Sequence, residues 1–244
     1  MNIVAVVSQK GGTGKSTVSA ALAVAAGRHG VPTLVADTDP QGTLVEWNKL
    51  RASSVPMVMA AKSAAIHPMR FAAERAGVEL MIIDTQAASL ACAVEAAKIA
   101  DLTLIVTRPS PVDLRAVSAT VAALRPLRRP CAFVLNQAPS RRAGREPSLI
   151  NSAIELLLDH GLPIAPSALR TRAIYQQAYV QGLSASELAP ESDAADEIFR
   201  LWAYVLSRLS QKAKVHSHAA QPLPSPAAFL ARSGAARLHQ PPAS

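Results

Sequence analysis

The sequence predicts an α/β fold: a doubly wound, mostly parallel sheet with helices on both faces. Short runs rich in β-branched residues alternate along the chain with Ala- and Leu-rich stretches of helical length. The runs are apolar almost throughout, as in strands that are covered on both faces. A glycine-rich segment directly follows the first run and precedes the first helical stretch, which is the context in which such segments bind phosphate.

The elements follow one another in a regular order. Five runs are predicted as strands: residues 3–7, 33–36, 80–84, 102–107 and 132–136. Four stretches between them are predicted as helices: residues 16–28, 64–76, 90–100 and 112–124. A last, amphipathic helix is predicted over residues 193–209, with Ile198, Leu201, Trp202, Val205 and Leu209 on its apolar side. Ligands of doubly wound sheets bind beyond the carboxyl ends of the strands, so the residues after each run are the candidate site.

Length and composition indicate one domain. We expect a single nucleotide-binding domain over residues 1–209 and a flexible, basic tail rich in Pro and Ala over residues 210–244. No apolar run reaches the roughly 18 residues of a membrane span, and the start lacks the features of a signal peptide, which favours a cytoplasmic protein. Two cysteines, Cys92 and Cys131, are too few for a disulfide framework and are interpreted as reduced thiols.

The charge is positive and unevenly distributed. The formal net charge is +8, and six arginines lie between Arg125 and Arg145 with no acidic residue among them. A basic excess of this kind favours contact with nucleic acid or another polyanion, and the alternative is an ordinary solvated face.

The segment KGGTGKST, residues 10–17, is predicted to bind the phosphates of a nucleotide. Its glycines allow a tight turn whose N–H groups point inward, and the following helix adds its positive end. Lys15 supplies a cation, Ser16 a hydroxyl for Mg²⁺, and Thr17 a contact to the α-phosphate. The predicted nucleotide-binding residues of this loop are Lys10, Gly11, Gly12, Thr13, Gly14, Lys15, Ser16 and Thr17. The loop is unusual, because Gln9 stands where the common pattern has its first glycine, and Lys10 adds a second lysine.

Three carboxylates follow predicted strands. Asp37 and Asp39 are two residues apart and point the same way in an extended chain. One of them is expected to hold Mg²⁺ or its water, and the other to orient the attacking water; we assign Asp37 to the metal and Asp39 to catalysis. Asp84 ends the run LMIID and is expected to reach Mg²⁺ through water. Taken alone, the DTDP segment is more often a turn and helix cap, but the phosphate loop one βα unit earlier favours a functional role.

These motifs resemble those of a known family. QKGGTGKST, DTDPQG and MIIDT are similar to the deviant Walker A ATPases of the ParA/MinD superfamily, and most similar to the small ParA-type partition proteins. The segments DTDPQGTLVEWNKL (37–50), TRPSPVDLRA (107–116) and LRTRAIYQQAYVQGLSASEL (169–188) extend the resemblance over residues 1–209.

The resemblance implies a mechanism. Lys10 corresponds to the family's signature lysine, which reaches the phosphates bound by the other subunit of an ATP-sandwich homodimer. Lys10, Lys15 and Asp39 would be catalytic, and Asn136 would contact the base. The resemblance further implies slow ATP hydrolysis with Mg²⁺, stimulated by a ParB-like partner or other cargo adaptor. It also implies non-specific DNA binding, a nucleoid-associated location, and the partition or positioning of a plasmid, a chromosome or another cargo.

Basic residues in late segments are the candidates for contact with the DNA backbone: Arg141, Arg142, Arg145, Arg170 and Arg172. No stable membrane anchor is expected.

Three alternatives remain at this point. A MinD-like, membrane-associated ATPase would use the tail, where residues 224–240 carry Phe229, Leu230 and Leu238. An iron-protein relative would need its cysteines at a dimer axis. A nucleotide-switched scaffold with negligible turnover is favoured by Gln86-Ala87, which replaces the family's usual proline-containing turn after Asp84.

Overall fold

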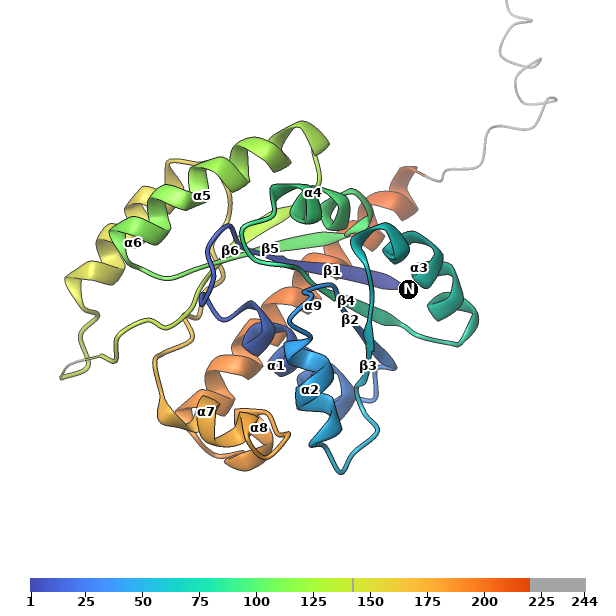
Figure 1. Cartoon of the computed structure of the whole chain (residues 1–244). Helices are drawn as coiled ribbons and strands as arrows, with labels where there is room; N and C mark the ends of the chain where they lie inside the picture. Colours follow the sequence, from blue (N-terminus) through green and yellow to red (C-terminus); the bar gives the residue numbers. More distant parts are fainter. Residues whose placement is uncertain (142, 220–244) are drawn as a thin grey trace, which may run out of the picture. The chain divides into compact units, whose positions relative to one another are not determined.

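The computed structural model describes residues 1–141 and 143–219, with side chains as far as residue 211. Within these residues all strands are parallel and form one six-stranded sheet in the order β3-β2-β4-β1-β5-β6 (Figure 1). The strands are β1 (Asn2–Val7), β2 (Thr33–Asp37), β3 (Met57–Ala60), β4 (Leu80–Asp84), β5 (Leu102–Thr107) and β6 (Cys131–Leu135). The α/β class and the parallel sheet predicted from the sequence are confirmed.

Helices cover both faces of the sheet (Figure 1). They are α1 (Lys15–Arg28), α2 (Thr43–Lys49), α3 (Ile66–Arg75), α4 (Leu90–Ile99), α5 (Pro111–Leu124), α6 (Ser148–Leu158), α7 (Ala173–Tyr179), α8 (Ala185–Leu188) and α9 (Asp193–Ala219). Two 3-10 turns, η1 (Ser63–Ala65) and η2 (Arg125–Leu127), join them. The helices α3, α4, α5 and α6 lie on one face, and the helices α1, α2, α7, α8 and α9 lie on the other (Figure 1).

Strand alternation divides the core into two layers. Val4 and Val6 of β1 pack with α1 and α9, whereas Ile3, Ala5 and Val7 pack with α4 and α5. Each strand therefore buries both of its faces, which explains why the strands are apolar almost throughout. Met1–Leu209 form one compact unit.

The sequence missed the edge strand β3. Its residues are mostly exposed, including Met57 (49%) and Met59 (46%), because only one neighbour, β2, pairs with it. Its residues, MVMA, are all apolar, but the run is only four residues long, which is too short to identify a strand by its pattern alone. The short helices α7 and α8 and the helix α6 were also not predicted.

The last helix begins at Asp193 as predicted, but it continues to Ala219 instead of ending at Leu209. The first residues of the segment predicted as a flexible tail are therefore helical. The sequence explains this, because Gln211, Lys212 and Ala213 are good helix formers and no proline occurs before Pro222. Residues 220–244, including the possible membrane segment 224–240, lie outside the described residues. No helix within the described part of the chain has the length and apolar character needed to span a membrane.

A buried arginine fastens α2 to α8. The guanidinium of Arg51, just beyond α2, donates to both carboxylate oxygens of Glu187 at 2.9 Å and to the carbonyl oxygen of Gly182 at 2.8 Å. The same guanidinium stacks 4.6 Å from the centre of the Trp47 ring. The Arg51 side chain is only 2% exposed, so the charge of its guanidinium is stabilised by the Glu187 carboxylate and not by water.

Replacing Glu187 with glutamine tests this ion pair. We expect the free energy of unfolding at about pH 7 to fall by about 2 kcal/mol, because Arg51 loses its charged partner. Burial raises the pKa of Glu187, but hydrogen bonds from Arg51 and the Ser184 N–H outweigh it and hold the pKa below its ordinary value of 4.5. The stabilisation is therefore complete above the ordinary pKa and disappears as the pH falls through the lowered one.

Denaturant unfolding of both proteins at about pH 7 and about pH 3 measures this effect, and the difference should become smaller in acid. Glu46→Gln is the matched control, since Glu46 is 62% exposed beside Lys49 and should cost well under about 1 kcal/mol. An equal difference at both pH values would contradict a charge-based role for Glu187.

Candidate nucleotide-binding site

The loop from Ser8 to Gly14 connects β1 to α1 at the carboxyl edge of the sheet. Gly12 and Gly14 have φ angles of 71° and 84°, in the left-handed region that L side chains rarely adopt. A Cβ on Gly14 would also lie 2.1 Å from the amide nitrogen of Asn136. A glycine is therefore required at position 14 by both backbone conformation and packing.

Asn136 and Gln137, which follow β6, hold the loop in place. The Asn136 amide donates to the carbonyl oxygen of Thr13 at 2.7 Å, and the Gln137 amide donates to that of Gly12 at 2.8 Å. The resemblance assigned Asn136 to the base. In the structure it lines the cavity beside the loop, and one of its amide N–H groups is engaged by the loop itself.

Lys15 is the buried cation of the site. The residue is 6% exposed, and burial lowers the pKa of its ammonium, while the negative charges of Asp84 and Asp39 act in the opposite direction. A desolvated ammonium interacts more strongly with an anion than an exposed one does. Lys15 therefore lies where the loop and the start of α1 would bind phosphates.

Asp84, at the end of β4, is fully buried against α1. Its two carboxylate oxygens accept hydrogen bonds from the Ser16 hydroxyl at 2.7 Å and from the Ser19 hydroxyl at 2.8 Å. Burial raises the pKa of Asp84 to about 7, although both hydroxyls and Lys15 oppose the shift. A cation placed here would favour the ionised carboxylate.

Ser19 is a site residue that sequence reasoning missed. It is fully buried and lies three residues after Ser16, on the same face of α1. A serine three residues after Ser16, which was predicted to bind the metal, was the sequence signal that could have identified Ser19.

Asp37 and Asp39 have different surroundings. Asp37 is buried, and its carboxylate accepts from the backbone N–H groups of Leu44 (2.9 Å), Val45 (3.2 Å) and Asp39 (3.2 Å). Burial raises its pKa in spite of these three bonds. Asp37 thus caps α2, which is the helix-cap role considered above as the alternative for the DTDP segment. It also lies opposite Asp84 in the β2–β4 register, so it remains beside the expected metal position. Asp39 is only partly buried and accepts from the Gln41 N–H at 3.0 Å.

The oxygen ligands present here suit Mg²⁺. Ser16 and Asp84 offer a hydroxyl and a carboxylate, the hard ligands that Mg²⁺ prefers. Among the described residues, no cluster of three or more His, Cys, Asp or Glu side chains could hold a metal ion. This agrees with Mg²⁺ held by one or two protein groups together with nucleotide phosphates and water.

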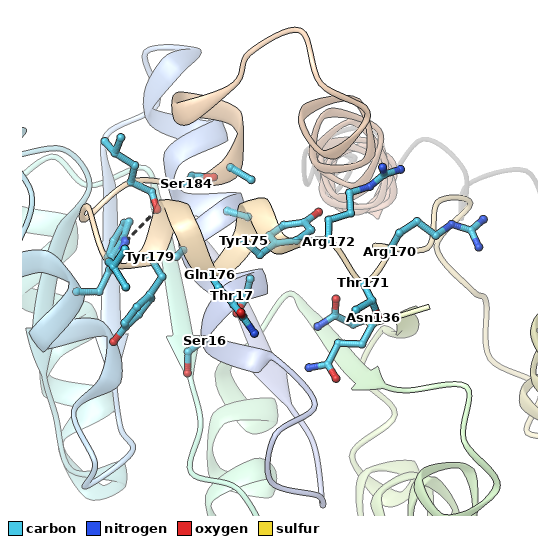
Figure 2. A pocket seen from close by; sticks show the side chains of 17 residues that line it. Ser16, Thr17, Asn136, Arg170, Thr171, Arg172, Tyr175, Gln176, Tyr179 and Ser184 are labelled. Atoms are coloured by element: carbon cyan, nitrogen blue, oxygen red, sulfur yellow. Dashed lines mark hydrogen bonds between the residues drawn. The ribbon is translucent and has the colours of Figure 1, made fainter. Parts of the chain in front are cut away.

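A cavity of about 520 Å³ opens beside the loop (Figure 2). It begins at Ser16 and Thr17 and extends between α1, α2 and α7. Its wall includes the following side chains: Trp47, Asn136, Arg170, Thr171, Arg172, Tyr175, Gln176 and Tyr179. A nucleoside attached to phosphates on the loop would lie in this cavity, whose apolar and amide groups suit a planar base.

Lys10 lies on a different side of the loop from Lys15. It is partly exposed and lines a concave surface of about 660 Å³ together with Arg108 and Asp113. Arg108 binds Asp113 through two nitrogens, at 2.9 and 3.1 Å, and the Ser110 hydroxyl also donates to this carboxylate. Although burial alone would raise it, hydrogen bonds from Arg108 and Ser110 hold the pKa of Asp113 below its usual range, and the charge of Lys10 adds to this.

Two of the predicted DNA-binding arginines are engaged in ion pairs within the fold. Arg170 is 8% exposed and binds Glu146 and the carbonyl oxygen of Pro139, at 2.5 and 2.7 Å. Arg172 pairs with Glu197 at 2.7 Å and Asp193 at 3.0 Å. Both carry charge that the fold already uses, so neither presents a free guanidinium.

The other predicted arginines lie in the loop before α6. Arg141 is exposed but is paired with Glu146 at 2.6 Å. Arg145 is exposed and makes no ion pair with a described residue. Arg142 lies outside the described residues.

The cysteines lie near opposite edges of the sheet. Cys131 is the first residue of β6 and is buried, whereas Cys92 follows β4 in α4 and accepts from the Ser63 hydroxyl at 3.1 Å. In a parallel sheet all strands start at one edge and end at the other. The start of β6 and the region after the end of β4 therefore lie at opposite edges of the sheet. This placement does not favour a shared cluster.

Residues 4–184 match the family model described as the CobQ/CobB/MinD/ParA nucleotide binding domain. The chain belongs to this family. The predicted relation to the ParA/MinD superfamily is thereby confirmed, and the glycine loop, the buried lysine and Asp84 are placed within its nucleotide-binding domain.

Two similar proteins are both named "Maintenance of carboxysome distribution protein A". The one from Halothiobacillus neapolitanus is 30% identical over 205 residues, covering 80% of this chain and 91% of that protein. The one from Gloeobacter kilaueensis is 29% identical over 217 residues, covering 82% and 95%.

Solved structures of the family share the fold. Apo McdA from Cyanothece superposes with a TM-score of 0.70 at 18% identity, over 82% of this chain and 98% of that chain. The cell division ATPase MinD from Pyrococcus furiosus gives 0.67 at 20% identity, over 84% and 98%.

Replacing Ser19 with alanine tests its support of Asp84. We expect Mg²⁺-dependent ATP affinity to fall roughly tenfold, because the carboxylate loses a fixed donor and its ionised form becomes less favourable. ATP binding titrated against Mg²⁺ measures this. The matched control is Ser207→Ala, which removes an exposed hydroxyl that donates to the Tyr204 carbonyl on α9. An unchanged Mg²⁺ requirement in Ser19→Ala would show that Asp84 does not act at the cation.

Proposed function

We propose that this chain is a positioning ATPase that binds ATP and Mg²⁺, forms an ATP-sandwich homodimer and hydrolyses ATP slowly. The contrasting placement of its two loop lysines carries the proposal. Lys15 is buried beside Asp84 in its own loop, whereas Lys10 lies partly exposed on the concave surface with Arg108 and Asp113. A cation held outside its own phosphate loop is available to phosphates bound by a second chain, as arginine fingers are in trans.

Each residue has a role in the proposed reaction. Lys15 and the loop N–H groups would bind the phosphates, and Ser16 and Asp84 would hold Mg²⁺, with Asp37 beside them. Bound Mg²⁺ would supply positive charge to the phosphate oxygens. Asp39 is partly exposed at the mouth of the site and is suited to orient the attacking water. Lys10 of the second chain would add charge stabilisation.

The relatives favour one kind of cargo. Both similar proteins are named for the maintenance of carboxysome distribution, which supports a large protein assembly as cargo over a plasmid or a chromosome. We propose that an adaptor on the cargo, serving as a ParB-like protein does, stimulates hydrolysis. The proposed location is the cytoplasm, on the nucleoid.

DNA binding would depend on exposed arginines. Of the predicted arginines that the structure describes, Arg170 and Arg172 are engaged in ion pairs, which leaves Arg145 and the partly engaged Arg141. Backbone contacts by such residues give affinity that depends on salt and not on sequence.

Two substitutions test the reaction. Lys10→Ala should bind ATP like the wild type but fail to dimerise with it, because the cation from the second chain is missing. Asp39→Ala should still dimerise, with hydrolysis slowed about 100-fold or more because the water is no longer oriented. Light scattering after size exclusion measures the dimer, and phosphate release measures hydrolysis.

Lys98→Ala is the matched control for Lys10→Ala. Lys98 lies on α4, 47% exposed and paired with Glu95, so its loss should leave dimerisation unchanged. ATP-dependent dimerisation that survives Lys10→Ala would disprove the sandwich arrangement. Wild-type protein that binds ATP without hydrolysing it would favour the switched scaffold.

A pair of arginine variants tests the DNA surface. Arg145→Ala should melt like the wild type and weaken DNA binding a few-fold, with a shallower salt dependence, since one phosphate contact is lost. Arg170→Ala should instead lower the free energy of unfolding by about 2 kcal/mol, because the buried guanidinium no longer bonds to Glu146 and to the Pro139 carbonyl. Thermal unfolding and DNA binding at several salt concentrations measure both. Full DNA affinity in Arg145→Ala would remove this arginine from the surface.

A further inference from the structure

The helix α2 is joined along its whole length to the segment α7–α8. At its first residue, the carbonyl oxygen of Thr43 accepts a hydrogen bond from the Tyr179 hydroxyl at 3.0 Å. In its middle, the Trp47 indole N–H donates to the carbonyl oxygen of Leu183 at 3.2 Å. At its end, Arg51 binds Gly182, where a Cβ would lie 2.5 Å from the backbone of Leu50. These contacts make α2 and α7–α8 move together.

The first turn of α2 is also tied to the catalytic loop. Asp37 accepts from the N–H groups of Leu44 and Val45 in α2 and from the N–H of Asp39. The Gly42 N–H, at the cap of α2, donates to the carbonyl oxygen of Asp39 at 2.9 Å. The position of Asp39 therefore follows the position of the start of α2.

The same assembly lines the nucleoside cavity, since Trp47 and Tyr179 both belong to its wall. Tyr175, Gln176 and Tyr179 of α7 line the cavity that begins at Ser16 and Thr17 (Figure 2). A nucleoside in this cavity would contact α7 directly, while its phosphates lie on the loop. The helix α7, through Tyr179, thus borders both the nucleoside position and the start of α2.

We propose that Tyr179 is a positioning residue that couples occupancy of the nucleoside cavity to the placement of Asp39. Its hydroxyl makes the link nearest to the catalytic loop, whereas the links of Trp47 and Arg51 lie farther along α2. This inference rests on the proposed function, because it assumes that the cavity takes the nucleoside of ATP. It adds that the protein senses the nucleoside through α7 and orients its catalytic carboxylate through α2.

The residue is well placed for a test without unfolding. Tyr179 is 36% exposed, so removal of its hydroxyl leaves the ring in place and no polar group is stranded in the core. Tyr179→Phe should lower kcat about tenfold and leave the Kd for ATP within about twofold, because the water is less well oriented while the contacts to nucleotide remain. A purely structural role would change both or neither.

Amide hydrogen exchange adds a readout that does not need turnover. In the wild type, ADP should slow the exchange of the Leu44 and Val45 amides, which are bound to Asp37. In Tyr179→Phe, ADP should bind but no longer protect these amides. Tyr204→Phe is the matched control, since its hydroxyl on α9 has no partner among the described residues and lies outside the cavity wall.

The outcomes are distinguishable. If the wild type binds no nucleotide, the proposed function fails, and the inference fails with it. If it binds nucleotide but Tyr179→Phe keeps both kcat and the protection of Leu44 and Val45, only the coupling is disproved. Loss of kcat and protection with unchanged Kd, in Tyr179→Phe and not in Tyr204→Phe, establishes it.

Discussion

The burial of the Asp84 carboxylate is the constraint on which the site depends. A carboxylate with no exposed surface must be satisfied by donors or by a cation, and both hydroxyls that satisfy it come from the first turns of α1. This fixes how α1 packs on β4. The helix can approach so closely because its buried face is built from alanines and valines. The phosphate loop, whose last residue is the cap of α1, is positioned as a consequence.

The same constraint explains why the two neighbouring aspartates differ. Asp37 lies opposite Asp84 in the adjacent strand, and two ionised carboxylates there would repel each other. Asp37 is stabilised by three backbone N–H groups, and Asp84 by two hydroxyls and the nearby Lys15. Asp39, two residues on, remains partly exposed and free of the core. The ends of two neighbouring strands thus supply a buried pair of carboxylates and, two residues beyond one of them, the partly exposed carboxylate that we propose orients the water.

The sequence predicted what depends on local pattern. Apolar runs identified most of the buried strands, and glycines identified the loop, because Gly12 and Gly14 adopt left-handed conformations that other residues rarely adopt. It could not find Tyr179 or Trp47, whose partners are 136 residues away along the chain. The sequence also could not show the bonds that Arg170 makes within the fold. A cluster of arginines suggests a surface, and only the fold shows that Glu146 and Pro139 surround one of them.

The two lysines of the loop have different electrostatic surroundings, which supports the proposal that one short segment serves two chains. Lys15 is buried and lies near the negative charges of Asp84 and Asp39. Moving its ammonium away would leave the buried Asp84 carboxylate without a nearby cation, which is unfavourable. Lys10 has no such tie and lies beside Asp113, whose charge is already neutralised by Arg108. Its ammonium can therefore move toward a second chain at small electrostatic cost. In the proposed mechanism the nucleoside is sensed on the α7 side of the loop and the partner chain on the Lys10 side. A site contacted from both sides links assembly to nucleotide state, because each contact changes the free energy of the other.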